Sequence, residues 1–331
     1  MSRELPFLVL CVEEYKNSKG MTGEIIHGSV AYIAERIGIL AKVEKARQKL
    51  AGSRLGVIGA PSDWLIASDA DKEAYAERLG ITLVDIPINE LLEDYESAAA
   101  DQLSPEAEAV LAAFEAKGAK ALHKYADGAF RIYKALRRVI DRHCLSGLTI
   151  RCFDLLDAIG NTGCLALAIL NAEGIPAGCE GDVPALMSMA IGNALTGCCG
   201  FQSNPSRIDP QTGELTLAHC TVPLNMVLGY DFNTHFESGI GIAICGEMPL
   251  GDVTIFKTSG DLGRNFCCEA ECLPHTFQSE LCRTQITMRL KGKDAERSAI
   301  CSEYFLKNPI GNHHIIFPGH LKALFDAFCL Y

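Results

Sequence analysis

The chain has 331 residues and a formal net charge of −11, and 48% of its residues are hydrophobic against 21% charged. These values suit a soluble globular protein of roughly two domains with a sizeable core. The acidic balance disfavours nucleic acid and anionic membranes as partners, and no apolar run approaches the roughly 18 residues that a membrane helix needs.

The amino-terminal residues and the cysteines predict the compartment. The apolar run over residues 7–12 is short and leads into two acids, so it predicts a buried strand rather than a secretory signal. Of the 15 cysteines, only Cys11 precedes Cys144. Without a signal peptide, we expect a cytoplasmic protein with reduced thiols rather than disulfides.

The first part of the chain alternates strand and helix signals. Strands are predicted over residues 54–59, 81–86 and 148–153. Helices are predicted over 24–50, 71–79, 88–95, 104–142 with a break near Gly118, 163–172 and 183–195. This order predicts an α/β domain over residues 1–197, with a parallel sheet covered by helices on both faces. Functional groups in such sheets gather at the carboxyl ends of the strands.

The pattern changes after Gly197. Strand-like runs at 214–219, 239–245, 252–257, 265–272 and 284–291 are separated by turn signals. They predict a β-rich, barrel-like domain over residues 198–331 that ends in a helix over 321–328.

Three features of the second half favour chemistry. Glu180 and Asp182 lie between an apolar stretch and a predicted helix, where acids bind metal, move protons or simply complement the helix dipole. His313, His314 and His320 fall within eight residues, a clustering that favours function. An apolar run separates His313 from His320, so both need not bind one metal.

The cysteines in the β-rich half have a plainer interpretation. Their C-C-x3-C-x9-C spacing lacks the CxxC pairs of structural zinc sites, which favours core thiols. The residues are Cys267, Cys268, Cys272 and Cys282.

Together these segments resemble the family of L-fucose isomerase and its relatives, including arabinose isomerase. Residues 174–182, Gly-Ile-Pro-Ala-Gly-Cys-Glu-Gly-Asp, resemble the family's metal-binding segment, and the helix rich in Ala, Leu and Met follows as expected. Residues 215–220, 246–255 and 311–320 resemble later family segments, and the resemblance spans roughly residues 50–331.

The resemblance implies a flavodoxin-like α/β domain, a β-rich domain, and isomerisation of aldoses to ketoses through an enediol with a divalent metal, usually Mn²⁺. It implies Glu180 as ligand and proton carrier and His320 as the histidine ligand. Asn204 stands where the family has aspartate. An amide oxygen can coordinate a cation but accepts no proton at neutral pH, so Asp182, Asp209 or His313 would have to assist Glu180.

Three further residues are candidates for contacts with a sugar. They are Arg151, which could equally form a surface ion pair, and His219 and His235, which could equally be structural. The resemblance also implies a homo-oligomer, a trimer or hexamer, although the chain is short for the family in its amino-terminal part. The alternative functions are a non-catalytic sugar-binding or metabolite-binding protein and another enediolate reaction, such as epimerisation or aldol cleavage.

Overall fold

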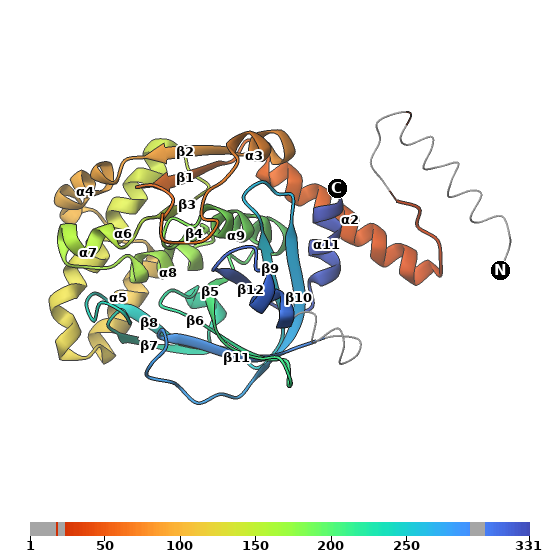
Figure 1. Cartoon of the computed structure of the whole chain (residues 1–331). Coiled ribbons are helices and arrows are strands. Elements are labelled where there is room, and N and C mark those ends of the chain that lie inside the picture. The colour runs from red at the N-terminus through yellow and green to blue at the C-terminus, as the bar shows by residue number, and fades with distance from the viewer. Residues whose placement is uncertain (1–17, 19–23, 292–301) are drawn as a thin grey trace, which may run out of the picture.

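A computed structural model describes residue 18 and residues 24–291 and 302–331; the predicted strand over 7–12 lies outside these ranges. The first part contains a four-stranded parallel sheet in the order β2-β1-β3-β4 (Figure 1). In that order the strands are Thr82–Ile86, Arg54–Ile58, Gly147–Ile150 and Ala177–Gly178. The predicted α/β architecture with a parallel sheet is thereby confirmed.

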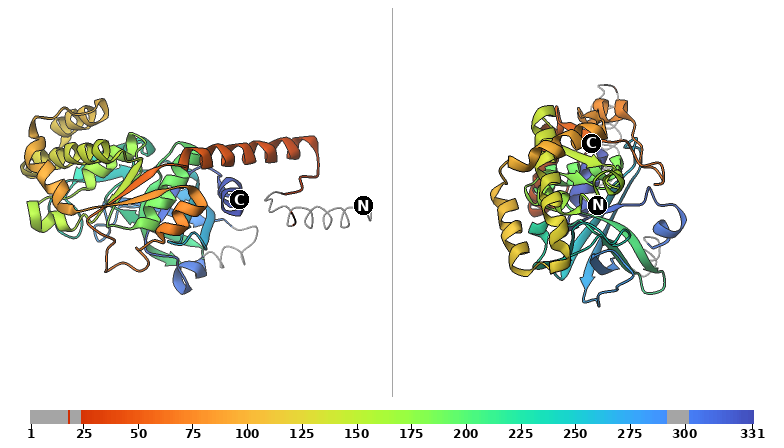
Figure 2. Two further views of the ribbon diagram at one scale, coloured as in Figure 1. Left: turned by 90° about the horizontal axis from the view of Figure 1, so that it is seen from above. Right: turned by 90° about the vertical axis from the view of Figure 1, so that its left-hand side faces the viewer.

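Helices connect these strands and cover the sheet. They are α2 (Val30–Leu50), α3 (Lys72–Leu79), α4 (Ile88–Ser97), α5 (Pro105–Lys117), α6 (His123–His143), α7 (Asp154–Ile159), α8 (Cys164–Ala172) and α9 (Val183–Thr196). The Ser104 hydroxyl accepts from the Ala107 N–H and caps α5, and Pro105 follows it, as the sequence predicts. The amino-terminal half of α2 extends beyond the rest of the described chain, as the left view of Figure 2 shows.

The second part is a closed barrel in the order β10-β11-β6-β5-β12-β9. Its strands along the chain are β5 (Phe201–Asp209), β6 (Glu214–His219), β9 (Gly251–Thr258), β10 (Asn265–Leu273), β11 (Thr284–Leu290) and β12 (His314–Pro318). A separate pair, β7 (Gly229–Asn233) and β8 (Ala243–Glu247), lies beside it, and α11 (Lys322–Leu330) ends the described chain. The predicted β-rich second part is confirmed.

The prediction of a strand over 239–245 is wrong at its start. Gly239 and Gly241 have left-handed φ values of 67° and 68°, which break the extended conformation, and β8 begins only at Ala243. The two glycines instead shape a loop in which His235 meets the ring of Phe153, just beyond β3, and Gly241 packs against Thr162.

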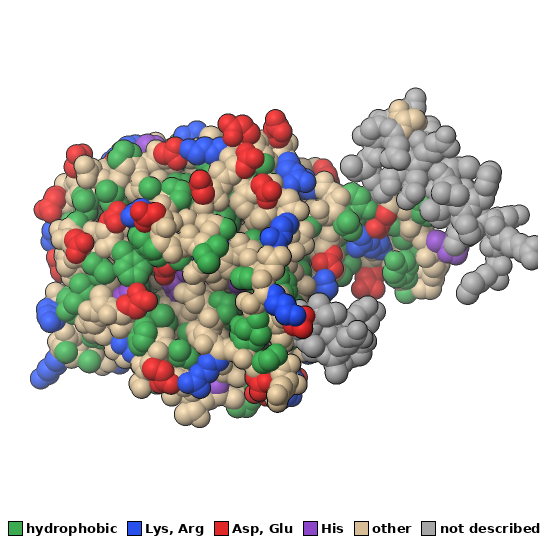
Figure 3. Space-filling model, in the orientation of Figure 1, with side chains coloured by type: hydrophobic (Ala, Val, Ile, Leu, Met, Phe, Trp, Pro, Cys, Tyr) green, Lys and Arg blue, Asp and Glu red, His purple; other side chains and the backbone are tan. Residues whose placement is uncertain are grey.

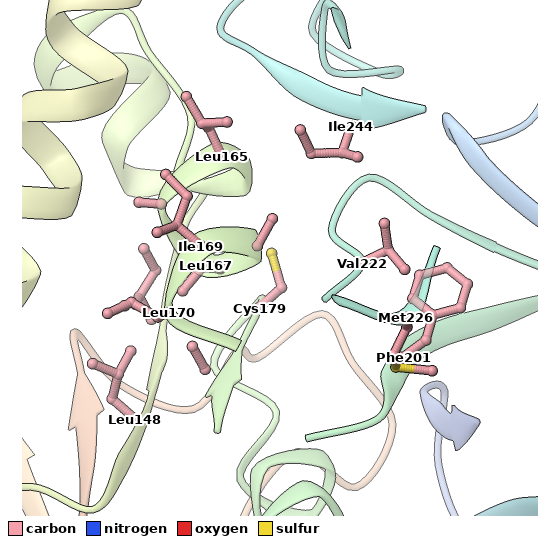
Figure 4. Close-up of a cluster of buried hydrophobic side chains, with 14 of the residues drawn as sticks. Leu148, Leu165, Leu167, Ile169, Leu170, Cys179, Phe201, Val222, Met226 and Ile244 are labelled. Carbon is pink, nitrogen blue, oxygen red and sulfur yellow. The ribbon is translucent and has the colours of Figure 1, made fainter. Parts of the chain in front are cut away.

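Apolar packing is continuous between the two parts. One buried cluster joins Leu148 and Leu167 to Phe201, Val222 and Ile244 of the β-rich part (Figure 4). The proposed division at residue 197 therefore stays a prediction, because the core crosses it without interruption.

Helix α9 holds the sheet and the barrel together. It contacts β3 and β4 as well as β9 and β12, and most of its side chains are buried. At Gly192 the absence of a side chain lets the ring of Phe317 pack against the helix, since a Cβ there would lie 2.0 Å from that ring. Gly197, with φ of 79°, ends the helix.

Among the described residues, every cysteine is a free thiol, and no helix combines the length and apolar character needed to cross a membrane. On the face in Figure 3, basic side chains are scattered among acidic and apolar ones.

The contact of Gly192 with Phe317 makes a stability prediction. Gly192→Ala should lower the free energy of unfolding by about 1–3 kcal/mol, because the fully buried ring cannot yield without disturbing the core. Gly38→Ala, in an exposed part of α2 with open space around it, should instead be neutral or stabilise by about 0.5–1 kcal/mol. Urea denaturation measures both, and equal effects of the two variants would contradict the packing at α9.

Candidate active site

A tight turn after β4 carries Glu180 at the carboxyl end of the parallel sheet. Glu180 and Gly181 have left-handed φ values of 62° and 63°, a conformation that costs a non-glycine residue of the order of 1–3 kcal/mol. Neighbours hold it in place: the Ser62 hydroxyl donates to the Glu180 carbonyl, and the Gly181 N–H donates to the Ile150 carbonyl at 2.9 Å. Only glycine fits at 181, where a Cβ would lie 2.5 Å from the Ala60 carbonyl oxygen.

Asp182, two residues on, is sealed inside the protein. It accepts a hydrogen bond from the Ala185 N–H at 2.7 Å and so caps α9. Its carboxylate also accepts from Lys257 Nζ at 3.2 Å and from His313 Nδ1 at 2.9 Å. Burial alone would raise the pKa of Asp182, but Lys257 and His313 outweigh it and lower the pKa below its ordinary value. Asp182 is therefore a charged structural carboxylate that orients His313.

His313 immediately precedes β12 and is fully buried. Its Nδ1 is held by Asp182, while its Nε2 lies 3.7 Å from Glu180 Oε1 and has no hydrogen-bond partner among the residues that the structure describes. Burial would lower the pKa of His313, but the two carboxylates raise it to about 9. A buried ring nitrogen without a partner, aimed at a carboxylate, is a place where a further ligand fits.

His219 approaches the same carboxylate from the end of β6. Its Nε2 lies 3.4 Å from Glu180 Oε1, and its Nδ1 is 3.0 Å from the Thr221 hydroxyl. The rings of His219 and His313 meet edge to face at 5.2 Å between centroids. Each of these two buried imidazoles thus directs its Nε2 toward Glu180, while a neighbouring side chain holds its Nδ1.

Glu180 itself is charged. Burial would raise its pKa, but the charges and hydrogen bonds of His313 and His219 hold the pKa well below its usual range. Its side chain is 15% exposed and faces an open space that the buried side chains of His219 and His313 do not line.

That space is a cavity of about 680 Å³, a size common for sites that bind small molecules. Asn204 of β5 lies in its wall beside Glu180, so the structure brings these two predicted residues together. The lining consists of Trp64, Leu65, Phe153, Glu180, Asn204, Pro205, Glu237 and Asn312.

The donor atoms around Glu180 suit a divalent cation. Buried imidazoles whose second nitrogen is held by a carboxylate or hydroxyl are typical of metal ligands, and carboxylate and amide oxygens suit hard cations. A second combination also lies close together, since Cys179 Sγ, a Glu180 oxygen and a His219 nitrogen all fall within 4.8 Å of one another. Cys179 is the weaker donor, because its contact with Cys152 Sγ at 3.1 Å and its burial raise its thiol pKa well above the ordinary value.

His320 does not reach this site. The extended strand β12 separates it from His313, and at about 3.3 Å per residue the two ends of the segment are on the order of 20 Å apart. His320 is 57% exposed, and its ring contacts Asp252 at 2.5 Å and Glu269 at 3.6 Å. The structure thus places His320 apart from Glu180, and the histidine of this segment that approaches Glu180 is His313.

Asp209 is also placed elsewhere. It lies at the far end of β5, where its carboxylate accepts from the backbone N–H groups of Gln211 and Thr212. These backbone hydrogen bonds lower its pKa and stabilise the turn into β6. Asp209 therefore cannot assist Glu180, and the sealed position of Asp182 leaves that residue only an orienting role.

Arg151 and His235 lie behind the cavity wall. Arg151 follows β3 and stacks over the indole of Trp64 at 4.8 Å, while His235 meets the ring of Phe153 edge to face at 5.8 Å. Both support aromatic residues of the lining, and neither lines the cavity itself.

Sequence reasoning did not predict six lining residues, namely Trp64, Leu65, Phe153, Pro205, Glu237 and Asn312. Trp64 and Phe153 follow β1 and β3, at the sheet edge where functional groups were expected, so strand ends offered a signal for them. Glu237 lies on the loop before β8, where no pattern in the sequence marks it.

Comparison with known proteins gives relatives but no matching family model. The chain is 28% identical over 235 residues to a sulfoquinovose isomerase of Clostridium sp. (strain MSTE9), 25% identical over 240 residues to one of Alkalicoccus urumqiensis, and 23% identical over 235 residues to one of Priestia aryabhattai. The matches cover 68%, 69% and 69% of this chain and 52% of each relative. The chain thus spans about half the length of these sugar isomerases.

The buried pair beneath the site makes a stability prediction. Lys257→Met removes the cation but keeps most of the volume, so Asp182 would stay buried with His313 as its single charged partner. We expect the free energy of unfolding to fall by about 3–5 kcal/mol. In Lys322→Met, which loses a half-exposed pair with Asp326, the change should stay within about 1 kcal/mol. Denaturant titration measures both, and similar small losses would mean that Asp182 is not a buried charge.

Proposed function

We propose that this chain carries the reaction site of a metal-dependent aldose–ketose isomerase acting on a sugar. The observation that supports this most is the pair of buried imidazoles, His219 and His313, whose Nε2 atoms lie 3.4 and 3.7 Å from the Glu180 carboxylate. The similarity to proteins named sulfoquinovose isomerase supports the reaction class independently.

Glu180, His219 and His313 would hold the metal, with the Asn204 amide oxygen as a further donor. Mn²⁺ is our choice, because the family resemblance implies it and the oxygen donors of Glu180 and Asn204 suit it. When bound, such a cation supplies Lewis acidity to a sugar carbonyl. Asp182 orients His313 by accepting a hydrogen bond from its Nδ1, and Nε2 would coordinate the metal after giving up its proton.

Proton transfer between neighbouring sugar carbons falls to Glu180. It is ionised, lies at the cavity surface, and is held by a turn that leaves it little freedom. Asn204 cannot share this task, because an amide accepts no proton. Glu237 lines the same cavity and is our candidate for moving the hydroxyl proton.

Two apolar rings shape the rest of the cavity. Trp64 and Phe153 meet edge to face at 5.4 Å and offer the C–H face of a sugar a packing surface that excludes water. Arg151 holds Trp64 in place from behind. A homo-oligomer, as the family resemblance implies, stays part of this proposal.

Isotope exchange tests the reaction. With Mn²⁺ present, the protein should transfer solvent deuterium to C1 or C2 of a suitable aldose, and Glu180→Gln should slow this by at least about 100-fold. His320→Gln is the matched control, because its side chain is exposed and lies at the other end of β12. We expect that variant to stay within about twofold of the original protein.

The outcomes separate the competing functions. Exchange without net isomerisation would favour epimerisation or aldol chemistry through the same enediolate. Sugar binding without exchange would favour a non-catalytic binding protein. Full activity of Glu180→Gln together with loss in His320→Gln would overturn the site assignment.

Metal affinity tests whether the Thr221 hydroxyl supports His219 as a metal ligand. Thr221→Val preserves side-chain shape but removes the hydroxyl beside His219 Nδ1, so we expect Mn²⁺ affinity to fall about 10–100-fold. Thr216→Val on β6, which removes a hydroxyl contact with Thr287, should leave affinity unchanged. Electron paramagnetic resonance of free Mn²⁺ measures both, and equal affinities would argue against His219 as a ligand.

A further inference from the structure

The charged side chains that line the cavity indicate which sugars the cavity can bind. The described lining contains two carboxylates, Glu180 and Glu237, and two amides, Asn204 and Asn312, but no lysine or arginine. A sulfonate or phosphate group normally needs arginine or lysine donors when it leaves water. Within the described residues, this wall provides none.

The guanidinium that stacks on Trp64 of the wall is already engaged. Arg151 pairs with Asp63 and Asp154 at 3.2 Å each, reaches the Pro61 carbonyl at 3.4 Å, and stacks on Trp64. The carboxylates of Asp63 and Asp154 carry two negative charges against the single positive charge of Arg151. An anion that approached Arg151 would therefore meet net negative charge.

The ammonium group of Lys257 is also fully engaged, in an ion pair with Asp182. Lys257 is fully buried and both oxygens of Asp182 accept from it, at 3.2 and 3.3 Å. It is absent from the cavity lining, and moving it there would leave Asp182 unpaired inside the protein.

We propose that this cavity takes an uncharged sugar, and that it discriminates against sugars bearing a sulfonate, phosphate or carboxylate. This inference rests on the proposed function for the location of the sugar site. The proposed substrate class differs from the sugar in the relatives' names, because sulfoquinovose carries a sulfonate. Glu237 is the residue that enforces the choice, since its carboxylate and that of Glu180 together offset the two charges of a bound divalent cation and leave no net positive charge to attract an anion.

The single tryptophan allows a direct binding test. Trp64 is the only tryptophan of the chain and lines the cavity, so its fluorescence reports occupancy without requiring catalysis. Titration with 6-deoxyglucose and with its 6-sulfonate, in the presence of Mn²⁺, compares two sugars that differ only by the anion. We expect the neutral sugar to bind at least about tenfold more tightly. Equal or tighter binding of the sulfonate would overturn the inference.

Reversing the charge of Glu237 tests whether this residue causes the discrimination against anionic sugars. Glu237→Lys should shift the affinity ratio toward the sulfonated sugar by about tenfold or more. Glu247→Lys, an exposed carboxylate on β8 outside the lining, should leave the ratio unchanged. An unchanged ratio in Glu237→Lys would show that the wall charge does not set the selection.

The isotope experiment keeps the two proposals apart. If the neutral sugar binds preferentially but no deuterium enters it, the isomerase proposal fails and the substrate class stands. If the sulfonated sugar binds preferentially and exchanges, the isomerase proposal stands and the substrate class fails. If neither sugar changes the Trp64 fluorescence, both fail.

Discussion

The buried carboxylate of Asp182 is the interaction on which the site depends. It joins three elements that are distant in sequence, since it caps α9, pairs with Lys257 of β9 and holds His313 at the start of β12. Burying one unpaired charge is costly, whereas this carboxylate meets two charged partners and a backbone N–H. The same contacts that attach the barrel to the α/β part therefore also fix the direction of His313.

Backbone strain complements this network. The left-handed turn at Glu180 and Gly181 directs two nearby acidic side chains differently. Glu180 faces the cavity, and Asp182 is buried in the core. A relaxed turn would not separate them in this way. Strain of this kind persists only where the surroundings determine it, and here the Ser62 hydroxyl and the Ile150 carbonyl do so.

Much of this arrangement could be predicted from sequence, but not which histidine completes it. Alternation of strands and helices gave the sheet, and Glu180 and Asn204 fell at strand positions that meet in one wall. His313 and His320 were expected at opposite ends of a strand, yet only the register of β12 against β5 and β9 decides which end lies beside Asp182. Glu237 comes from a loop, where no periodicity constrains a side chain.

Asn204 changes the charge of the proposed site more than its shape. Asparagine and aspartate are nearly isosteric, and the amide oxygen remains a donor for a hard cation. With an amide, a divalent cation held by Glu180 and two neutral imidazoles would keep one more positive charge than it would beside an aspartate. That surplus weakens the hold on the metal but strengthens attraction for the negative charge that develops on a sugar oxygen during enediol formation. An isomerase with Asn204 is therefore electrostatically consistent, provided that Glu180 carries the carbon-bound proton alone.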